Sequence, residues 1–150
     1  MKYGDELILD LHGCDPALFT AARIEEFMRG FCDKILDMTR GPFHVWGFDD
    51  PLEKAQAASH LKGTSAIQFI ETSNVTIHCL DDLGSVYLNV FSCKPFDVRS
   101  AIRFCSAFFH ADTWVSEIVT RSSVGSVSSV VKSPLRSSLL PCGADCGGGD

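Results

Sequence analysis

Long hydrophobic runs, dense clusters of basic residues and a positively charged start are all missing from this 150-residue chain. Without an apolar run of about 18 residues it has no candidate transmembrane segment, and its net charge of −6 offers no electrostatic surface for nucleic acid or anionic lipid. The opening MKYGDELILDLHG carries acidic residues where a signal peptide would have a positive segment followed by an apolar one. We therefore expect a cytoplasmic protein that binds neither nucleic acid nor a membrane.

Common catalytic and binding motifs are missing as well. The sequence has no phosphate-binding loop, no dinucleotide-binding glycine pattern, no Ser-His-Asp spacing and no paired zinc-ligand motif. Its seven cysteines are scattered and do not form the regular framework of a secreted disulfide scaffold. Cys142 and Cys146 form an isolated C-x-x-x-C without a nearby histidine. We predict mostly free thiols and no metal site.

The pattern of apolar residues predicts five strands and two long helices. We expect strands over residues 6–11, 42–48, 64–80, 85–92 and 113–120. Asp15 and Pro16 should begin the first helix, which Gly41 and Pro42 end, and Asp97 should cap a second helix whose buried face reaches Phe109. Residues 51–58 add one or two helical turns.

This order, β-α-β-β-β-α-β, predicts an α+β fold: a two-layer α/β sandwich with a mainly antiparallel sheet and both helices packed on one face. The other face of the sheet would need a cover, for which we expect a second copy of the chain. We place this domain in residues 1–121. Residues 122–150 are rich in serine and glycine and are predicted to form a flexible tail, in which the run 127–131 is apolar enough to dock locally.

The chemistry of the sequence is concentrated in residues 70–93, IETSNVTIHCLDDLGSVYLNVFSC, which otherwise have the pattern of a β-hairpin. A tight turn at residues 82–83 would pair Ser73 with Ser92 and Thr72 with Cys93. His78 does not join them easily, because five extended residues place it about 16 Å from Ser73 and on the opposite face. Joint action of Ser73 and His78 would require a bend or break near Ser73.

The same hairpin resembles the prokaryotic-type S-adenosylmethionine decarboxylases, small pyruvoyl-dependent enzymes of polyamine synthesis. SNVTIH, followed by VYLNVFSCKPFD, is similar to the family's S-H-x-[ST]-I-H segment and its downstream F-[ST]-C. LILDLHGCD resembles the family's first strand, and GTSAIQFIETS its approach to the cleavage site. The resemblance covers most of residues 4–120 and needs no insertion between Ser65 and Cys93.

The resemblance implies a proenzyme that cleaves itself between Thr72 and Ser73 and converts Ser73 to a covalently bound pyruvoyl group, the cofactor. This ketone would form a Schiff base with the substrate, S-adenosylmethionine, and spermidine synthesis would consume the product. The resemblance further implies that Ser65 and His78 assist processing and that Cys93 reprotonates the decarboxylated carbon. It also implies a homo-oligomer, a dimer or larger, of cleaved αβ units with active sites near the subunit interface.

The chain departs from the family pattern around the predicted cleavage site. Thr72 and Asn74 flank Ser73 where the family usually has glutamate and histidine, and Glu71 lies one place earlier than that glutamate. Asp82, in CLDD where the family has TWPE, takes the place of a glutamate associated with the ribose hydroxyls. Glu71 and Asp82 are the predicted substrate-binding residues.

An aromatic residue that would stack on adenine is also missing before Gly63, and Trp46 or Phe48 from the neighbouring strand is the candidate replacement. Three functions therefore stay open: a self-processing S-adenosylmethionine decarboxylase, a pyruvoyl-dependent decarboxylase of arginine or ornithine, and an uncleaved binding or regulatory homologue.

Overall fold

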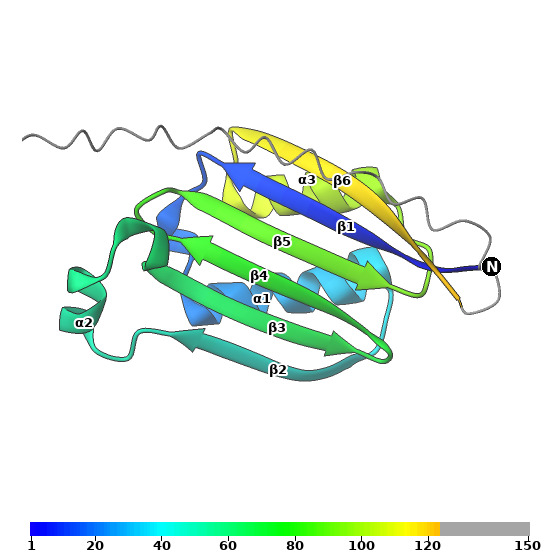
Figure 1. The fold of residues 1–150 in the computed structure, drawn as a ribbon, viewed down its shortest axis with the longest axis horizontal. Helices are drawn as coiled ribbons and strands as arrows, with labels where there is room; N and C mark the ends of the chain where they lie inside the picture. The colour runs from blue at the N-terminus through cyan, green and yellow to red at the C-terminus, as the bar shows by residue number, and fades with distance from the viewer. Residues whose placement is uncertain (124–150) are drawn as a thin grey trace, which may run out of the picture.

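A six-stranded antiparallel sheet forms one layer of the structure, a computed structural model that describes residues 1–123 (Figure 1). The strands are β1 (Lys2–His12), β2 (Arg40–Gly47), β3 (Gly63–Ile70), β4 (Ser73–Leu80), β5 (Ser85–Ser92) and β6 (Thr113–Ser122). They are arranged in the order β2-β3-β4-β5-β1-β6, and each neighbouring pair is antiparallel.

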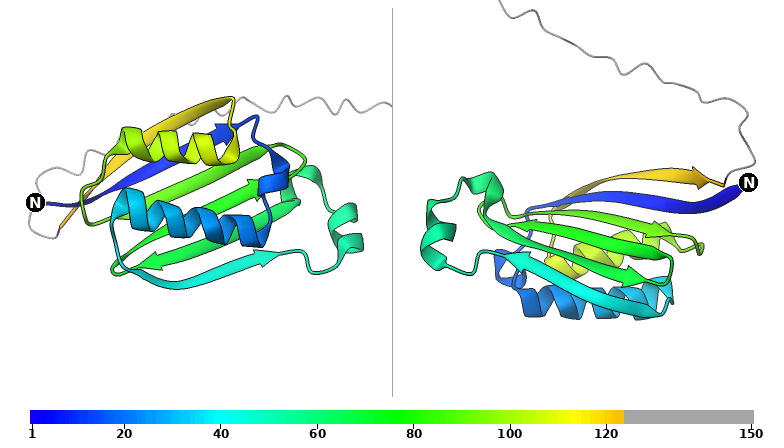
Figure 2. Two further views of the ribbon diagram at one scale, coloured as in Figure 1. Left: turned by 180° about the vertical axis from the view of Figure 1, so that it is seen from behind. Right: turned by 60° about the horizontal axis from the view of Figure 1, so that its bottom comes forward.

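The second layer consists of helices on one face of the sheet (Figure 2). Its two long helices are α1 (Ala21–Phe31), extended by a π-helical turn η2 (Cys32–Leu36), and α3 (Val98–Phe109). The short elements η1 (Pro16–Leu18), α2 (Pro51–Gln56) and η3 (Ser59–Leu61) lie in the connections. The predicted α+β two-layer sandwich is thus confirmed. No helix within residues 1–123 is both long and apolar enough to cross a membrane.

The first helix differs from its prediction at both ends. Asp15 caps only the 3-10 turn η1, through the amide of Ala17, and Thr20 caps α1 by accepting a hydrogen bond from the amide of Arg23. At the other end the helical region stops at Leu36, because Asp37 adopts a left-handed conformation with φ 49°. Gly41 and Pro42 therefore lie in β2 and do not terminate the helix.

The predicted cap of the second helix is confirmed. The Asp97 carboxylate accepts hydrogen bonds from the amides of Arg99 and Ser100 and so satisfies two of the amides that a helix start leaves unpaired. On the buried face of α3, Cys105 and Phe109 are completely inaccessible to solvent.

The prediction of one strand over residues 64–80 is wrong. The chain reverses at Glu71 and Thr72, so that Ile70 pairs with Ser73 and two strands, β3 and β4, replace one. Glu71 makes this turn with a positive φ of 45°. The second turn lies where it was predicted: Leu80 pairs with Ser85, in the register expected for a turn at residues 82–83.

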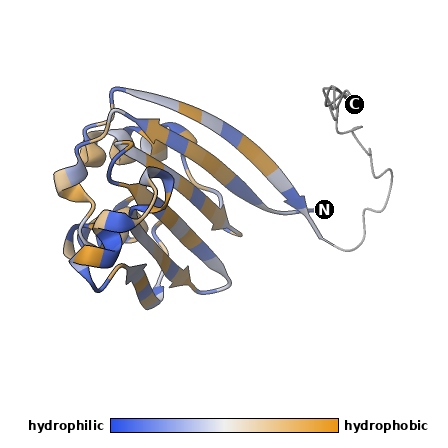
Figure 3. Cartoon of the chain, turned by 60° about the vertical axis from the view of Figure 1, so that its left-hand side comes forward, coloured by the Kyte–Doolittle hydropathy of each residue, from blue (hydrophilic) through white to orange (hydrophobic). Residues whose placement is uncertain are grey.

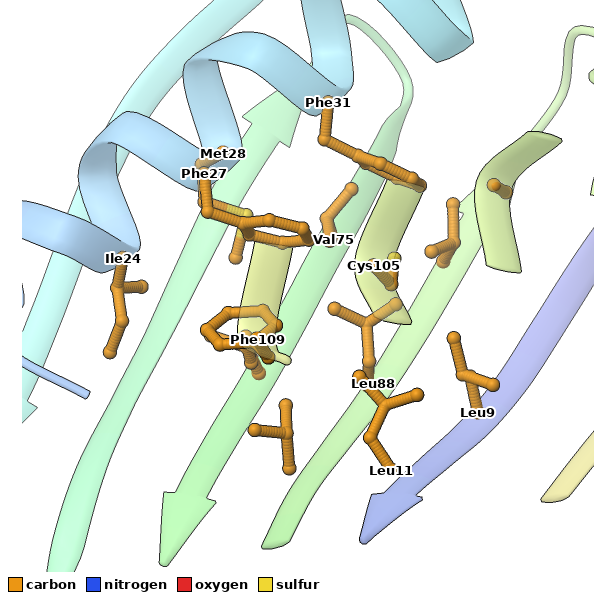
Figure 4. Close-up of a cluster of buried hydrophobic side chains, with 14 of the residues drawn as sticks. Leu9, Leu11, Ile24, Phe27, Met28, Phe31, Val75, Leu88, Cys105 and Phe109 are labelled. Atoms are coloured by element: carbon orange, nitrogen blue, oxygen red, sulfur yellow. The ribbon is translucent and has the colours of Figure 1, made fainter. Parts of the chain in front are cut away.

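One face of the sheet buries the apolar core against the helices. Polar and apolar residues are interspersed along the strands (Figure 3), and in β1, β3, β4 and β5 the side chains directed at the helices are mostly buried. The edge strands β2 and β6 leave helix-facing side chains such as Val45 and Trp114 about half exposed. Phe27 of α1 meets Phe109 of α3 above this face (Figure 4), with 4.8 Å between their ring centroids, and Phe31 stacks on Phe27 at 5.4 Å. On the opposite face no helix formed by residues 1–123 is present (Figure 2).

The predicted tail lies, from residue 124 onward, outside the described residues. This part includes the apolar run at 127–131 as well as Cys142 and Cys146.

Replacing Phe27 by alanine should reduce the free energy of unfolding by about 3–5 kcal/mol, because a completely buried ring would leave a cavity at the junction of both helices. Urea denaturation measures this change. Leu52→Ala, at a side chain 71% exposed on α2, is the matched control and should cost less than about 0.5 kcal/mol. Equal costs for the two variants would contradict this description of the core.

Candidate active site

Ser73 is the first residue of β4 and directly follows the turn at Glu71 and Thr72. It shares the helix-facing side of the strand with Val75 and is only 4% exposed. Its hydroxyl oxygen accepts a hydrogen bond from the backbone amide of Cys93, at 3.0 Å. The predicted register therefore does bring Ser73 and Cys93 together.

Thr72 contacts the same cysteine. Its hydroxyl oxygen lies 3.3 Å from the Cys93 sulfur, within hydrogen-bonding distance for a thiol. Hydrogen bonding by the Ser73 and Thr72 hydroxyls, in that order, lowers the pKa of the Cys93 thiol below its ordinary value, although partial burial and the charge of Glu71 act in the opposite direction.

The other cysteines in residues 1–123 have the opposite property. Burial raises the pKa of Cys14 to about 11 and that of Cys32 to about 12. It also raises the pKa of Cys79 and of Cys105. Within the described chain, Cys93 is thus the cysteine whose surroundings favour a thiolate.

Cys93 is held in place from both sides. The next residue, Lys94, donates from its ammonium group to the carbonyl oxygen and the carboxylate of Asp37, at 2.7 and 2.8 Å, which ties the segment to the end of the helical region. On the other side β1 passes very close, since a Cβ on Gly4 would lie 2.3 Å from the carbonyl oxygen of Ser92. Lys94, Asp37 and Gly4 were not predicted as site residues, because their contacts come from elements far apart in the chain.

The turn before Ser73 carries backbone strain. A positive φ is unfavourable for a glutamate, which has a Cβ, and costs on the order of 1–2 kcal/mol. Glu71 has this unfavourable conformation, with φ 45°, one residue before the peptide bond that joins Thr72 to Ser73. Strain is therefore stored beside the predicted cleavage site.

A second cluster of polar side chains lies on the face of the sheet opposite to α1 and α3. Ser65 of β3 pairs directly with His78 of β4, and the Ser65 hydroxyl lies 2.8 Å from His78 Nδ1. Trp46 of β2 is the next residue across, paired with Ser65 and 66% exposed. Together they line a cavity of about 310 Å³, completed by His44, Val45, Ala66, Ile67 and Thr76.

The two clusters do not meet within one chain. Ser73 and His78 both belong to β4, which is an unbroken strand, and five residues of a strand span about 16 Å. Their side chains also point to opposite faces, as their parity requires. The chain does break near Ser73, but it does so before that residue, and this turn brings Ser73 no closer to His78.

The predicted substrate-binding residues are divided between the two ends of β4. Glu71 lies in the turn beside Ser73, whereas Asp82 lies in the turn that follows Leu80. The Asp82 carboxylate is 3.1 Å from the Lys62 ammonium, and hydrogen bonds from Lys62 and then Ser59 lower its pKa. Asp82 is thus ionised and already paired.

Comparisons with known proteins identify the family. A family model described as S-adenosylmethionine decarboxylase matches residues 5–122. The fold is similar to the crystal structure of the adenosylmethionine decarboxylase from Aquifex aeolicus, with a TM-score of 0.66 and 17% identity, over 85% of this chain and 98% of that chain. No curated protein matches. Because the family model spans most of the sequence, the chain belongs to the S-adenosylmethionine decarboxylase family.

Proposed function

We propose that this chain is a self-processing, pyruvoyl-dependent S-adenosylmethionine decarboxylase of spermidine synthesis, which cleaves itself between Thr72 and Ser73. The observation that carries the proposal is the placement of Ser73, buried at the start of β4, hydrogen-bonded to the amide of Cys93 and preceded by a strained turn.

Self-cleavage begins with attack of the Ser73 hydroxyl oxygen on the carbonyl carbon of Thr72, so that an ester replaces the amide. Loss of the Ser73 α-proton then breaks the ester bond, releases residues 1–72 with a carboxylate at Thr72 and leaves dehydroalanine at position 73. Water converts the dehydroalanine to pyruvoyl and ammonia. Strain at Glu71 supports this proposal, because breaking the chain beside it relieves the unfavourable conformation.

The pyruvoyl group supplies a ketone that, joined to the substrate amine, accepts the electrons left behind as carbon dioxide departs. The residues around position 73 fix the backbone there and supply the proton that replaces carbon dioxide on the substrate carbon. Cys93, fixed through its own amide and through the Lys94 contact to Asp37, is placed to protonate the carbon that loses carbon dioxide. Its thiol would be preserved in the reducing cytoplasm, where we place the enzyme.

We further propose that each active site is shared between two copies of the chain. Ser65 and His78 lie on the face of the sheet away from the helices, too far from Ser73 of their own chain to act on it. The same face exposes large apolar side chains, including Trp46 (66%), Phe69 (41%) and Val115 (64%), which a second sheet would cover. In such a homodimer, Ser65 and His78 of one copy would assist processing at Ser73 of the other, which requires the partner to reach the end of the sheet where the turn at Glu71 and Thr72 leads into Ser73.

The cavity beside His78 would then hold the adenosine part of the substrate. Trp46 offers an exposed aromatic face for the adenine ring and takes the role expected of an aromatic residue before Gly63. Its ring also lies near that of Phe48, with 5.9 Å between the centroids. Asp82 would bind the ribose hydroxyls and Glu71 the substrate near Ser73.

Two observations favour other candidates. The pairing of Asp82 with Lys62 engages the carboxylate that should bind ribose, which favours a pyruvoyl-dependent decarboxylase of arginine or ornithine. Thr72 and Asn74 beside Ser73 favour an uncleaved binding or regulatory homologue. Competition among S-adenosylmethionine, arginine and ornithine separates the first of these from our proposal. Analysis of the purified chain for cleavage separates the second.

Ser73→Ala should abolish both cleavage and decarboxylation, because no hydroxyl remains to attack Thr72. Mass spectrometry should find two fragments of the unaltered protein. The larger, residues 73–150, should be lighter by the mass of one ammonia than the same fragment with an unmodified Ser73. The variant should give a single intact chain. Ser116→Ala, at a strand serine in β6, is the control and should cleave normally. Cleavage of the Ser73→Ala variant would show that another residue is the nucleophile.

Sharing of the site predicts complementation between two defective chains. Ser73→Ala and His78→Ala variants should each fail alone, whereas co-expressed chains should form about one quarter of the normal number of complete sites, if pairing is random. A gel should show cleavage only of the His78→Ala chain, because that chain keeps Ser73 and receives His78 from its partner. Mixed dimers without any cleavage would contradict sharing, and a monomer in size-exclusion chromatography would contradict the dimer itself.

A further inference from the structure

The first step of the proposed self-cleavage moves a proton away from the Ser73 hydroxyl. Ser73 must lose its hydroxyl proton as it attacks Thr72, and the amide nitrogen of Ser73 must gain one as the peptide bond breaks. His78 of the same chain cannot exchange either proton, because it lies about 16 Å along β4 and on the other face. The groups that do surround the Ser73 hydroxyl come from Thr72 and Cys93.

Both residues of the cleavage site contact a single cysteine. The Ser73 oxygen accepts from the Cys93 amide at 3.0 Å, which leaves the hydroxyl proton free to be donated elsewhere. The Thr72 hydroxyl lies 3.3 Å from the Cys93 sulfur. Hydrogen bonds from both hydroxyls to this sulfur favour the thiolate. The cysteine amide thus positions the nucleophile while its sulfur is available to receive the proton.

We propose that the Cys93 thiolate, stabilised by the Thr72 hydroxyl, is the base that takes the Ser73 hydroxyl proton and returns it to the Ser73 nitrogen as the peptide bond breaks. The oxygen of Ser73 forms the new bond to the Thr72 carbon, the carbon–nitrogen bond breaks, and the thiol gives up the proton it received. No other reactant is needed. This inference rests on the proposed function, since it assigns a step within self-cleavage, and it makes Thr72 a positioning residue.

The charged side chains around Cys93 do not stabilise its thiolate, so the hydroxyl groups of Ser73 and Thr72 must do so. Within residues 1–123, the charged and titratable side chains around it are Lys2, Tyr3 and Asp5 of β1, Glu71 of the turn, Lys94 and its partner Asp37. Lys2 pairs with Asp5 at 2.6 Å and Lys94 with Asp37 at 2.8 Å, so each cation near the sulfur already has a counterion. Glu71 disfavours the thiolate. Hydrogen bonding, and not an unpaired cation, therefore favours the ionised sulfur.

A base at Cys93 also accounts for threonine at position 72. The resemblance leads us to expect a glutamate there, whose negative charge beside the sulfur would raise the pKa of the thiol. Thr72 is neutral, and its hydroxyl lies within hydrogen-bonding distance of the sulfur. The departure from the family pattern therefore favours the thiolate in this chain.

Titration of the thiol tests the contact between Thr72 and Cys93 without requiring cleavage. The full chain would carry Ser73→Ala, which prevents cleavage, together with Cys142→Ser and Cys146→Ser, so that the remaining cysteines other than Cys93 are buried ones. The rate of alkylation by iodoacetamide as a function of pH gives the pKa of Cys93. Adding Thr72→Val should raise this pKa by about one unit through loss of the hydrogen bond, whereas adding Thr72→Ser should leave it unchanged. An unchanged pKa in the valine variant would overturn the role of Thr72.

The pH dependence of cleavage tests the base itself, in chains that retain Ser73. Removing the Thr72 hydroxyl raises the pKa of the thiol, so less thiolate is present at a given pH. In Thr72→Val, the pH at which cleavage reaches half of its maximal rate should therefore be about one pH unit higher. Cys93→Ser should slow cleavage by about 10² to 10⁴-fold, while the chain with only Cys142→Ser and Cys146→Ser should cleave normally. Cleavage of Cys93→Ser at the normal rate would overturn the inference while leaving the proposed function intact. An unaltered chain that never cleaves would instead overturn both.

Discussion

The register of β4 against β5 is the constraint on which the candidate site depends. The register that pairs Leu80 with Ser85 continues along the whole hairpin, and at its far end it places Ser73 and Thr72 beside Cys93. A slip of one residue would turn every side chain of one strand to the opposite face. The buried Val75 and Ile77 make such a slip costly, because it would expose them and bury polar neighbours. The apolar core therefore fixes the chemistry at the end of the hairpin.

The two faces of the sheet divide the functional residues into two groups. Ser73 faces the helices and is buried, whereas Ser65, His78 and Trp46 lie on the face without helices. A buried nucleophile beside a strained turn suits a reaction of the chain with itself, because no substrate must reach it before cleavage. An exposed cavity with an aromatic wall suits recognition of a separate molecule. A second copy of the chain that contacts both the open face and the end of β4 at the Glu71–Thr72 turn would bring the two functions to one place.

Local signals in the sequence predict much of this arrangement. The turn after Leu80 is marked by Asp82 and Gly84, and its register correctly brings Cys93 to Ser73. The cap at Asp97 is equally visible, because the carboxylate precedes an apolar pattern of helical spacing. The family, too, follows from short motifs in this hairpin, and the family model bears it out.

Other features could not be predicted because they depend on distant parts of the chain. The turn at Glu71 and Thr72 contains neither glycine nor asparagine, and it forms because the apolar residues of both β3 and β4 must face the helices. Thr20 displaces Asp15 as the cap of the first helix, a choice between two suitable residues that local sequence leaves open. The contact of Lys94 with Asp37 joins residues that lie 57 positions apart.

The intact mass of the purified protein tests the central claim most directly. The account predicts two chains that separate after Thr72, the second beginning with a pyruvoyl group in place of Ser73. A single chain of 150 residues that stays uncut on prolonged incubation would contradict it.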